Sequence, residues 1–168
     1  LGQGAVWVDH STTSAEVAQE LAVEGQARGI AFIDAPVSGG NLGAINGTLT
    51  VMCGGDAAAF ERVKPVIHAY ARAVTLLGPA GSGQRAKMVN QICVAGVLQG
   101  LAEALAFGEK AGLDMPAVLE VIRQGAAQSW QMEHRGPTML QDRFDFGFAV
   151  DLMRKDLALC LHEARHIG

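Results

Sequence analysis

The sequence predicts an α/β unit followed by an all-α unit, because the pattern of apolar residues and helix formers changes once along the chain. Up to Gly78, short apolar runs typical of strands alternate with segments of helical spacing. From residue 84 to residue 111 the chain contains no proline and consists mostly of good helix formers. We therefore expect residues 1–78 to form a unit around a sheet, and residues 79–168 to form a helical unit that begins with a long helix.

The elements of the first unit are expected to alternate in type. A strand at residues 5–9, a helix from Val17 to Arg28 and a strand at residues 30–34 together predict a β-α-β unit. Four successive hydroxyl residues, Ser11 to Ser14, precede that helix and offer N-caps. Glycine and asparagine then crowd residues 38–47. The remaining expected elements are a strand at residues 48–55, a helix at residues 56–70 and a strand at residues 73–77.

The second unit is expected to contain four helices. The first covers residues 84–111 and is ended by Gly112. Asp114 and Pro116 are typical of a helix start and open the second helix, which runs to about Gln124. The last two helices are expected at residues 129–135 and at residues 148–167.

The composition describes a globular, mildly acidic protein. Hydrophobic residues make up 49% of the 168 positions and charged residues 18%, with a net charge of −4 and no run of Lys or Arg. This pattern argues against a nucleic-acid partner and against a membrane partner, and no uninterrupted apolar stretch reaches 18 residues. The three cysteines lie far apart, so we expect no disulfide framework and a cytoplasmic location.

The loop at residues 34–40, DAPVSGG, is the first candidate site. It follows directly on a strand, and ligands of open α/β sheets gather beyond the carboxyl ends of the strands. Gly39 and Gly40 let backbone N–H groups approach an anion without a Cβ in the way, and Ser38 adds a hydroxyl, so a carboxylate is a natural ligand. The alternative is an ordinary tight turn between strands.

Lys87, Asn90 and Gln91 form the second candidate site. They stand at positions i, i+3 and i+4 of the expected long helix, so their side chains project from one face. A lysine in a partly dry cleft has its pKa lowered toward the range useful for proton transfer, and the two amides can hydrogen-bond a hydroxyl or a carboxylate. The alternative is an ordinary solvated helix surface.

Two short patterns match known motifs, but we do not interpret them as sites. Residues 81–86 satisfy G-x-G-x-x-A, yet the helical pattern continues to residue 111 where a dinucleotide-binding unit needs a second strand, so the glycines are interpreted as a hinge. Residues 162–166 read H-E-x-x-H, a zinc pattern, but no third ligand follows. We therefore expect a solvated helix face there and no metal site.

Four segments in chain order carry the signatures of one enzyme family. They are D-x-S-T at residues 9–12, DAPVSGGNLGAINGTLTVMCGG at residues 34–55, G-x-G-x-x-x-K-x-x-N at residues 81–90 and L-x-x-K-D-L at residues 152–157. Together they resemble the 3-hydroxyisobutyrate dehydrogenase family, also called the β-hydroxyacid dehydrogenases, which is related to 6-phosphogluconate dehydrogenase. The signatures span nearly the whole chain, which makes the resemblance specific.

The resemblance implies the second half of a Rossmann-type domain, followed by the start of a helical C-terminal domain. It further implies hydride transfer between NAD or NADP and a small β-hydroxyacid or semialdehyde, with Lys87 as general acid and base. The implied substrate-binding residues are Ser38, Gly39, Gly40, Asn90 and Gln91, and the implied cofactor-binding residues are Thr12 and Lys155. Family members usually pair in dimers, so a homo-oligomer is expected.

Two departures from the family pattern define the remaining expectations. The glycine-rich dinucleotide loop of the family should precede Leu1, so we expect an internal piece of a longer enzyme that is inactive alone. Many members have Asn where this chain has Gln91, and Gln there is similar to the tartronate semialdehyde reductase branch. Succinic semialdehyde or glyoxylate reduction is an alternative activity, and a non-catalytic binding module of the same fold is an alternative function.

Overall fold

A computed structural model describes residues 2–168, which divide into two compact units. The first unit contains the residues up to Gln91 together with residues 147–168, and the second contains residues 92–146. One long helix, α4 (Ser82–Lys110), contributes to both units. The domain boundary that we expect from the sequence, near Gly78, differs from this division into compact units and stays a prediction.

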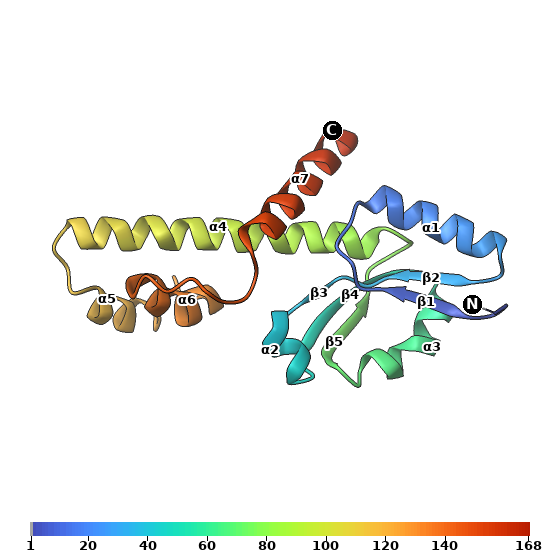
Figure 1. Ribbon diagram of the computed structural model, residues 1–168, viewed down its shortest axis with the longest axis horizontal. Helices are drawn as coiled ribbons and strands as arrows, with labels where there is room; N and C mark the ends of the chain where they lie inside the picture. The colour runs from blue at the N-terminus through green and yellow to red at the C-terminus, as the bar shows by residue number, and fades with distance from the viewer. Residues whose placement is uncertain (1) are drawn as a thin grey trace. The chain divides into compact units, whose positions relative to one another are not determined.

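The first unit is built on a mixed five-stranded sheet (Figure 1). Its strands are β1 (Val6–Asp9), β2 (Ala31–Asp34), β3 (Val37–Ser38), β4 (Leu49–Gly55) and β5 (Ala71–Leu76). Strands β1 and β2 are parallel, β2 and β3 each run antiparallel to β4, and β5 is parallel to β4. Helix α1 (Ala15–Ala27) joins the parallel strands β1 and β2, which confirms the predicted β-α-β unit.

Helices α1 and α3 (Ala57–Ile67) lie on opposite sides of the strands in Figure 1. The hydroxyl of Ser14 caps α1 by accepting a hydrogen bond from the N–H of Val17 at 3.2 Å. The carboxylate of Asp56 caps α3 in the same way. Because Ser14 is the working cap, α1 begins two residues before the helix start expected from the sequence.

Apolar side chains between the sheet and α3 form the core of the first unit. Ile33, Val51 and Cys53 from the strands are at most 1% exposed, and Phe60 and Ile67 from α3 are at most 4% exposed. Removal of this surface from water is the main stabilising contribution. It fixes the strands, and with them the loops that follow β1 and β2, where the candidate residues lie.

The segment between β2 and β4 contains two short elements that its composition did not predict, the strand β3 and a helix. A short helix, α2 (Gly40–Ile45), follows β3 directly. Asn46 is its C-cap, and Gly47, with a φ of 64°, turns the chain toward β4. The expected loop between two strands is therefore a strand end, one helical segment and a turn.

Helix α4 confirms the predicted long helix, and it is also unusually apolar. By length and composition alone it could cross a membrane, since an 18-residue window has a mean hydropathy of 1.4 and only 22% of that window is buried. Because no uninterrupted apolar run in the chain reaches 18 residues, the sequence did not predict this property of α4. Core helices of water-soluble proteins meet the same criterion, so a single such helix is weak evidence for a membrane.

The second compact unit, residues 92–146, is helical, as the sequence predicts for this stretch. Helices α5 (Met115–Ile122) and α6 (Trp130–Leu140) pack with the later turns of α4. The shared core consists of Leu101, Leu105, Met115, Leu119 and Met132. Helix α6 continues through Pro137, although its end was expected at Arg135. Gly136 allows this close packing, because a Cβ there would lie 3.1 Å from a methyl group of Leu119.

Candidate functional site

The two candidate sites predicted from the sequence meet within the first unit. Lys87 is buried at 7% exposure on the second turn of α4, and its Nζ donates a hydrogen bond to the carbonyl oxygen of Val37 at 2.9 Å. Val37 immediately precedes Ser38 in the predicted substrate-binding loop at residues 34–40. The structure therefore brings the lysine to the edge of the predicted carboxylate-binding loop, although the two are about fifty residues apart in the chain.

Burial determines the acid strength of Lys87. Removal from water disfavours the ammonium form and lowers the pKa of Lys87 below its ordinary value. The negative charge of Asp156 opposes this shift, and the positive charge of Lys155 adds to it. The lysine is thus a group whose proton is held less tightly than that of a surface lysine, which is the property required of a proton donor and acceptor.

The loop from Ser38 to Gly40 is a strand end followed by a sharp turn. Ser38 is half-buried and ends β3, where it is paired with Thr50. Gly39 and Gly40 are exposed and have φ angles of 125° and 59°, a region that side chains with a Cβ rarely adopt. The turn needs glycine at both positions for local reasons, so a role of these residues in carboxylate binding stays a prediction.

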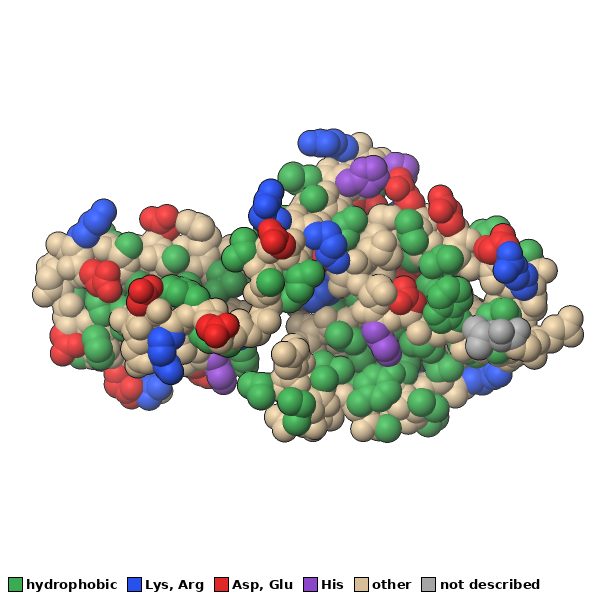
Figure 2. All heavy atoms as spheres, viewed as in Figure 1, with side chains coloured by type: hydrophobic (Ala, Val, Ile, Leu, Met, Phe, Trp, Pro, Cys, Tyr) green, Lys and Arg blue, Asp and Glu red, His purple; other side chains and the backbone are tan. Residues whose placement is uncertain are grey.

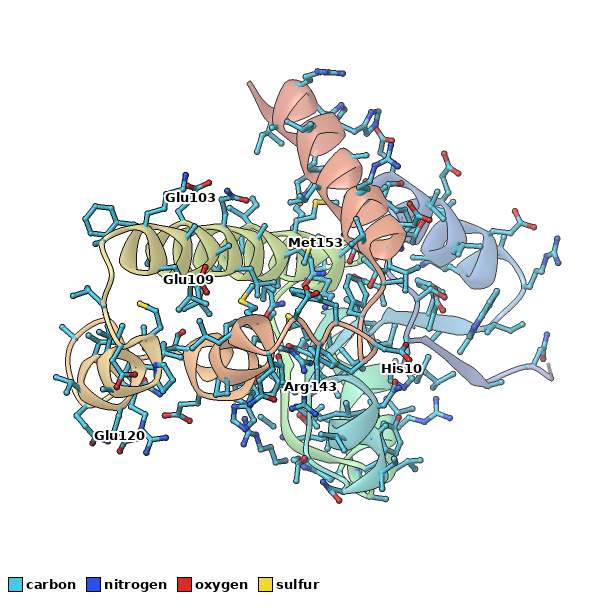
Figure 3. All side chains as sticks on the ribbon, turned by 60° about the vertical axis from the view of Figure 1, so that its left-hand side comes forward. His10, Glu103, Glu109, Glu120, Arg143 and Met153 are labelled. Carbon is cyan, nitrogen blue, oxygen red and sulfur yellow. The ribbon has the colours of Figure 1, made fainter. Side chains whose placement is uncertain are left out.

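Asn90 and Gln91 form a chain of amides that ends on a carboxylate. Asn90 Nδ2 donates to Gln91 Oε1 at 2.8 Å, and Gln91 Nε2 donates to Asp156 Oδ2 at 2.7 Å. Gln91 is only 4% exposed, whereas Asn90 is half-buried. Asn90 is therefore the more accessible of the two amides, and a role of either one in substrate binding stays a prediction. Figure 3 shows Met153 of α7 (Val150–Ile167) beside α4, where its sulfur lies 4.0 Å from the Gln91 amide.

Thr12 and Lys155, the predicted cofactor positions, are also brought together. The Nζ of Lys155 donates to the backbone carbonyl oxygen of Thr12 at 2.7 Å, and it lies 3.0 Å from the Asp156 carboxylate. Lys155 remains half exposed, while Asp156 is 2% exposed. Asp156 thus links the predicted cofactor side of the site to the amides of α4.

Three buried polar residues of this region were missed by reasoning from the sequence. They are Asp34, Gln84 and Asp156. Asp34 and Asp156 lie inside the recognised signatures, so those segments gave a signal, but neither position can be told from a surface carboxylate by spacing alone. The backbone N–H groups of Gly81 and Gln84 both donate to the Asp34 carboxylate at 2.9 Å. A side chain of the protein therefore fills the anion position at the start of α4.

His10 is a further polar residue close to the loop at residues 34–40. It directly follows β1 in the chain, and it is labelled in Figure 3. Its Nδ1 lies 2.6 Å from the carbonyl oxygen of Ala35, which can only accept, so this nitrogen carries the proton. The other ring nitrogen lies 2.8 Å from the hydroxyl of Tyr70. His10 thus holds the backbone of the loop that leads to Ser38.

The H-E-x-x-H pattern has other partners in the structure. His162 Nε2 and His166 Nδ1 lie 3.0 and 3.7 Å from the carboxylate of Glu16, while Glu163 pairs with Arg85 at 2.6 Å. Figure 2 shows histidine and acidic side chains gathered at the end of α7. Among residues 2–168, no group of three His, Cys, Asp or Glu side chains is arranged to hold a metal ion.

Two family models match the chain, one on either side of the start of α4. Residues 1–78 match the NAD binding domain of 6-phosphogluconate dehydrogenase. Residues 81–168 match a model described as the NAD-binding domain of NADP-dependent 3-hydroxyisobutyrate dehydrogenase. Both descriptions name nicotinamide-dependent dehydrogenases.

Individual proteins agree with these models. An uncharacterized oxidoreductase of Shewanella frigidimarina is 63% identical over 98% of this chain, and 2-hydroxy-3-oxopropionate reductase of Escherichia coli is 41% identical over 99% of it. The crystal structure of a 3-hydroxyisobutyrate dehydrogenase from Salmonella typhimurium matches 99% of this chain with a TM-score of 0.89 at 35% identity. The chain spans 57% of the first two proteins and 59% of the third.

Proposed function

The chain belongs to the β-hydroxyacid dehydrogenase family, and from this membership we propose that the full-length protein transfers a hydride between NAD(P) and a small β-hydroxyacid or semialdehyde. One observation carries the proposal beyond family membership. Lys87 is buried with a lowered pKa, and its Nζ lies 2.9 Å from the Val37 carbonyl oxygen, beside the loop that begins with Ser38. This is a proton donor placed next to a site suited to an anion.

Lys87 is the proposed general acid and base. In reduction, its ammonium gives a proton to the carbonyl oxygen of the substrate as a hydride adds to the carbonyl carbon, so that the C=O group becomes a hydroxyl-bearing carbon. In oxidation, the neutral amine takes the hydroxyl proton as the hydride leaves the same carbon. NAD(P), when bound, supplies or accepts that hydride.

The remaining predicted residues have supporting roles in the proposed reaction. The Ser38 hydroxyl and the backbone N–H groups at Gly39 and Gly40 hold the substrate carboxylate. Asn90 hydrogen-bonds the oxygen of the reacting carbon, and Gln91 orients Asn90 through their 2.8 Å hydrogen bond. The proposed substrate is of the 3-hydroxyisobutyrate or tartronate semialdehyde type.

Thr12 and Lys155 fit the nicotinamide side of the site. Thr12 follows β1, at the carboxyl end of a parallel strand, where dinucleotides bind in Rossmann-type sheets. Lys155 lies against it and keeps its ammonium half exposed to a ligand. We further propose that residues 1–78 are the C-terminal part of the cofactor-binding domain, that residues 79–168 belong to the helical domain, and that the protein is a cytoplasmic homo-oligomer.

A substrate screen on the full-length protein tests the proposal. Small hydroxyacids and semialdehydes, including 3-hydroxyisobutyrate, tartronate semialdehyde, succinic semialdehyde and glyoxylate, are offered with NAD and with NADP in both directions. The change in absorbance of the reduced nicotinamide is then followed. Turnover of at least one of these acids is expected, and binding of the acids without any turnover would instead favour a binding module of the same fold.

A further inference from the structure

The side chain of Gln84 lies where the segments of the proposed site meet. It is fully buried on the first turn of α4, three residues before Lys87. Its Nε2 donates to the carbonyl oxygen of Ser11 at 2.9 Å, and its Oε1 accepts a hydrogen bond from the N–H of Thr13 at 3.1 Å. One amide group therefore holds the backbone on both sides of Thr12.

The backbone of Gln84 connects the same turn to the substrate loop. Its N–H donates to Asp34 Oδ2 at 2.9 Å, and the N–H of Gly81 donates to Asp34 Oδ1 at 2.9 Å. Asp34 thereby satisfies two of the N–H groups that lack a partner at the start of any helix. Because Asp34 ends β2, the loop that continues to Ser38 is fixed to the helix turn that leads to Lys87.

The contact between the Asp34 carboxylate and the start of α4, which we call the junction, is tightly packed. A Cβ at Gly54 would lie 2.6 Å from Asp34 Oδ1, and a Cβ at Gly83 would lie 2.8 Å from Asp34 Oδ2. Both glycines let backbone pack directly against the buried carboxylate. A polar network that is closely packed and has its partners satisfied is rigid, so its members define positions rather than merely filling space.

We propose that Gln84 is a positioning residue of the proposed reaction, which sets the distance between the cofactor segment at Thr12 and the proton donor Lys87. The inference rests on the proposed function and deepens it. Gln84 touches neither substrate nor cofactor. Its side chain holds the cofactor segment, its backbone N–H holds the substrate loop through Asp34, and its helix turn leads to the proton donor. A misplacement of about 1 Å in such an arrangement can cost about 10²-fold in rate.

Two substitutions at Gln84 in the full-length protein separate positioning from folding. Gln84→Met keeps the length and volume of the side chain but loses both amide hydrogen bonds. Gln84→Glu retains an acceptor for Thr13, and it regains a donor for the Ser11 carbonyl only when the introduced carboxyl is protonated. Burial raises the pKa of such a carboxyl. Gln99→Met, at an exposed position of the same helix, is the matched control.

Three results are expected. Gln84→Met lowers kcat/KM by about 10- to 10²-fold, while Gln99→Met leaves it unchanged. The ratio of the kcat/KM of Gln84→Glu to that of wild type rises as the pH falls through the pKa of the introduced carboxyl. A merely structural role would not produce this pH dependence. Amide hydrogen exchange over residues 11–13 becomes faster in Gln84→Met without a matching change in the strands of the core.

Wild-type kcat/KM in Gln84→Met would overturn the proposal. If that variant does not fold, Gln84→Glu decides, and a ratio to wild type that is independent of pH would overturn the proposal. A wild-type protein without turnover of any hydroxyacid would instead overturn the proposed function. The exchange measurement needs no turnover, and unchanged exchange over residues 11–13 in a folded variant would show that Gln84 does not hold this segment.

Discussion

The carboxylate of Asp34 accepts the backbone N–H of Gly81 at 2.9 Å, at the glycine-rich start of α4. In dinucleotide-binding loops the anion at such a helix start is a phosphate of the cofactor. Here a side chain from the end of β2 takes that place. The pattern G-x-G-x-x-A at residues 81–86 therefore joins α4 to the sheet, and its anion position is filled by the protein itself. A hinge role of these glycines stays a prediction.

Asp34→Ala should lower the free energy of unfolding by several kcal/mol. Removal of the carboxylate leaves the N–H groups of Gly81 and Gln84 buried without an acceptor, at a cost of about 1–3 kcal/mol each. Urea unfolding of the full-length protein measures the loss. Asp145→Ala, at an exposed position, is the control. A loss no larger than that of the control would show that the junction is not a source of stability.

Cys53 should resist thiol reagents in the native protein. It is fully buried, and burial, aided by the negative charge of Asp34, raises the pKa of its thiol to about 11. At pH 8 only about one thiol in 10³ is then ionised, and the thiolate is the reactive form. Cys93 is exposed and should react readily. Mass spectrometry after brief alkylation distinguishes the two, and equal labelling of Cys53 and Cys93 would contradict the described core.

Gly40→Ala should raise the KM for the acid substrate clearly while it lowers Tm only slightly. The space around Gly40 is open in the structure, so an added Cβ meets no neighbour, but the φ of 59° costs about 1–2 kcal/mol in backbone strain. Gly39→Ala is the comparison, because its Cβ would also lie 3.3 Å from Leu49 and should reduce Tm further. If Gly40→Ala lowers Tm while KM stays unchanged, the loop is only a turn.

The local features of this chain could be predicted from its sequence, and the long-range contacts could not. Capping residues and hydrophobic spacing predicted α1, α3 and the long α4, and the i, i+3, i+4 spacing placed Lys87 and Asn90 on one face. Local spacing holds no information about which surfaces meet. The 2.7 Å contact between Gln91 and Asp156 joins residues 65 positions apart. It is therefore visible only in three dimensions.

Pro137 illustrates a second limit. Proline usually ends a helix because it lacks an N–H and crowds the preceding turn, and α6 was expected to end before it. The packing of Met132 and Gly136 against Leu119 holds α6 in helical form through Pro137 to Leu140. Tertiary contacts can override the local preference of one residue, and no window of the sequence contains them.

The rate of the proposed reaction should depend on pH through Lys87. Burial lowers the pKa of Lys87 below the ordinary value of a lysine, and oxidation requires the neutral amine. The kcat for hydroxyacid oxidation should therefore rise with pH through this lowered pKa, while kcat for reduction, which needs the ammonium, should fall over the same range. Profiles in both directions on the full-length protein measure this. Transitions that do not oppose one another would exclude Lys87 as the shared proton carrier.

The kcat of Lys87→Ala in the full-length protein is the most direct test of the proposed function. It should fall by about 10²–10⁴-fold, the range typical of a lost general acid or base, with cofactor affinity nearly unchanged. Lys87→Arg should not restore the rate, because arginine does not release its proton at accessible pH. Lys110→Ala, at the exposed end of the same helix, should turn over like wild type. Turnover of Lys87→Ala close to that of wild type would contradict the account.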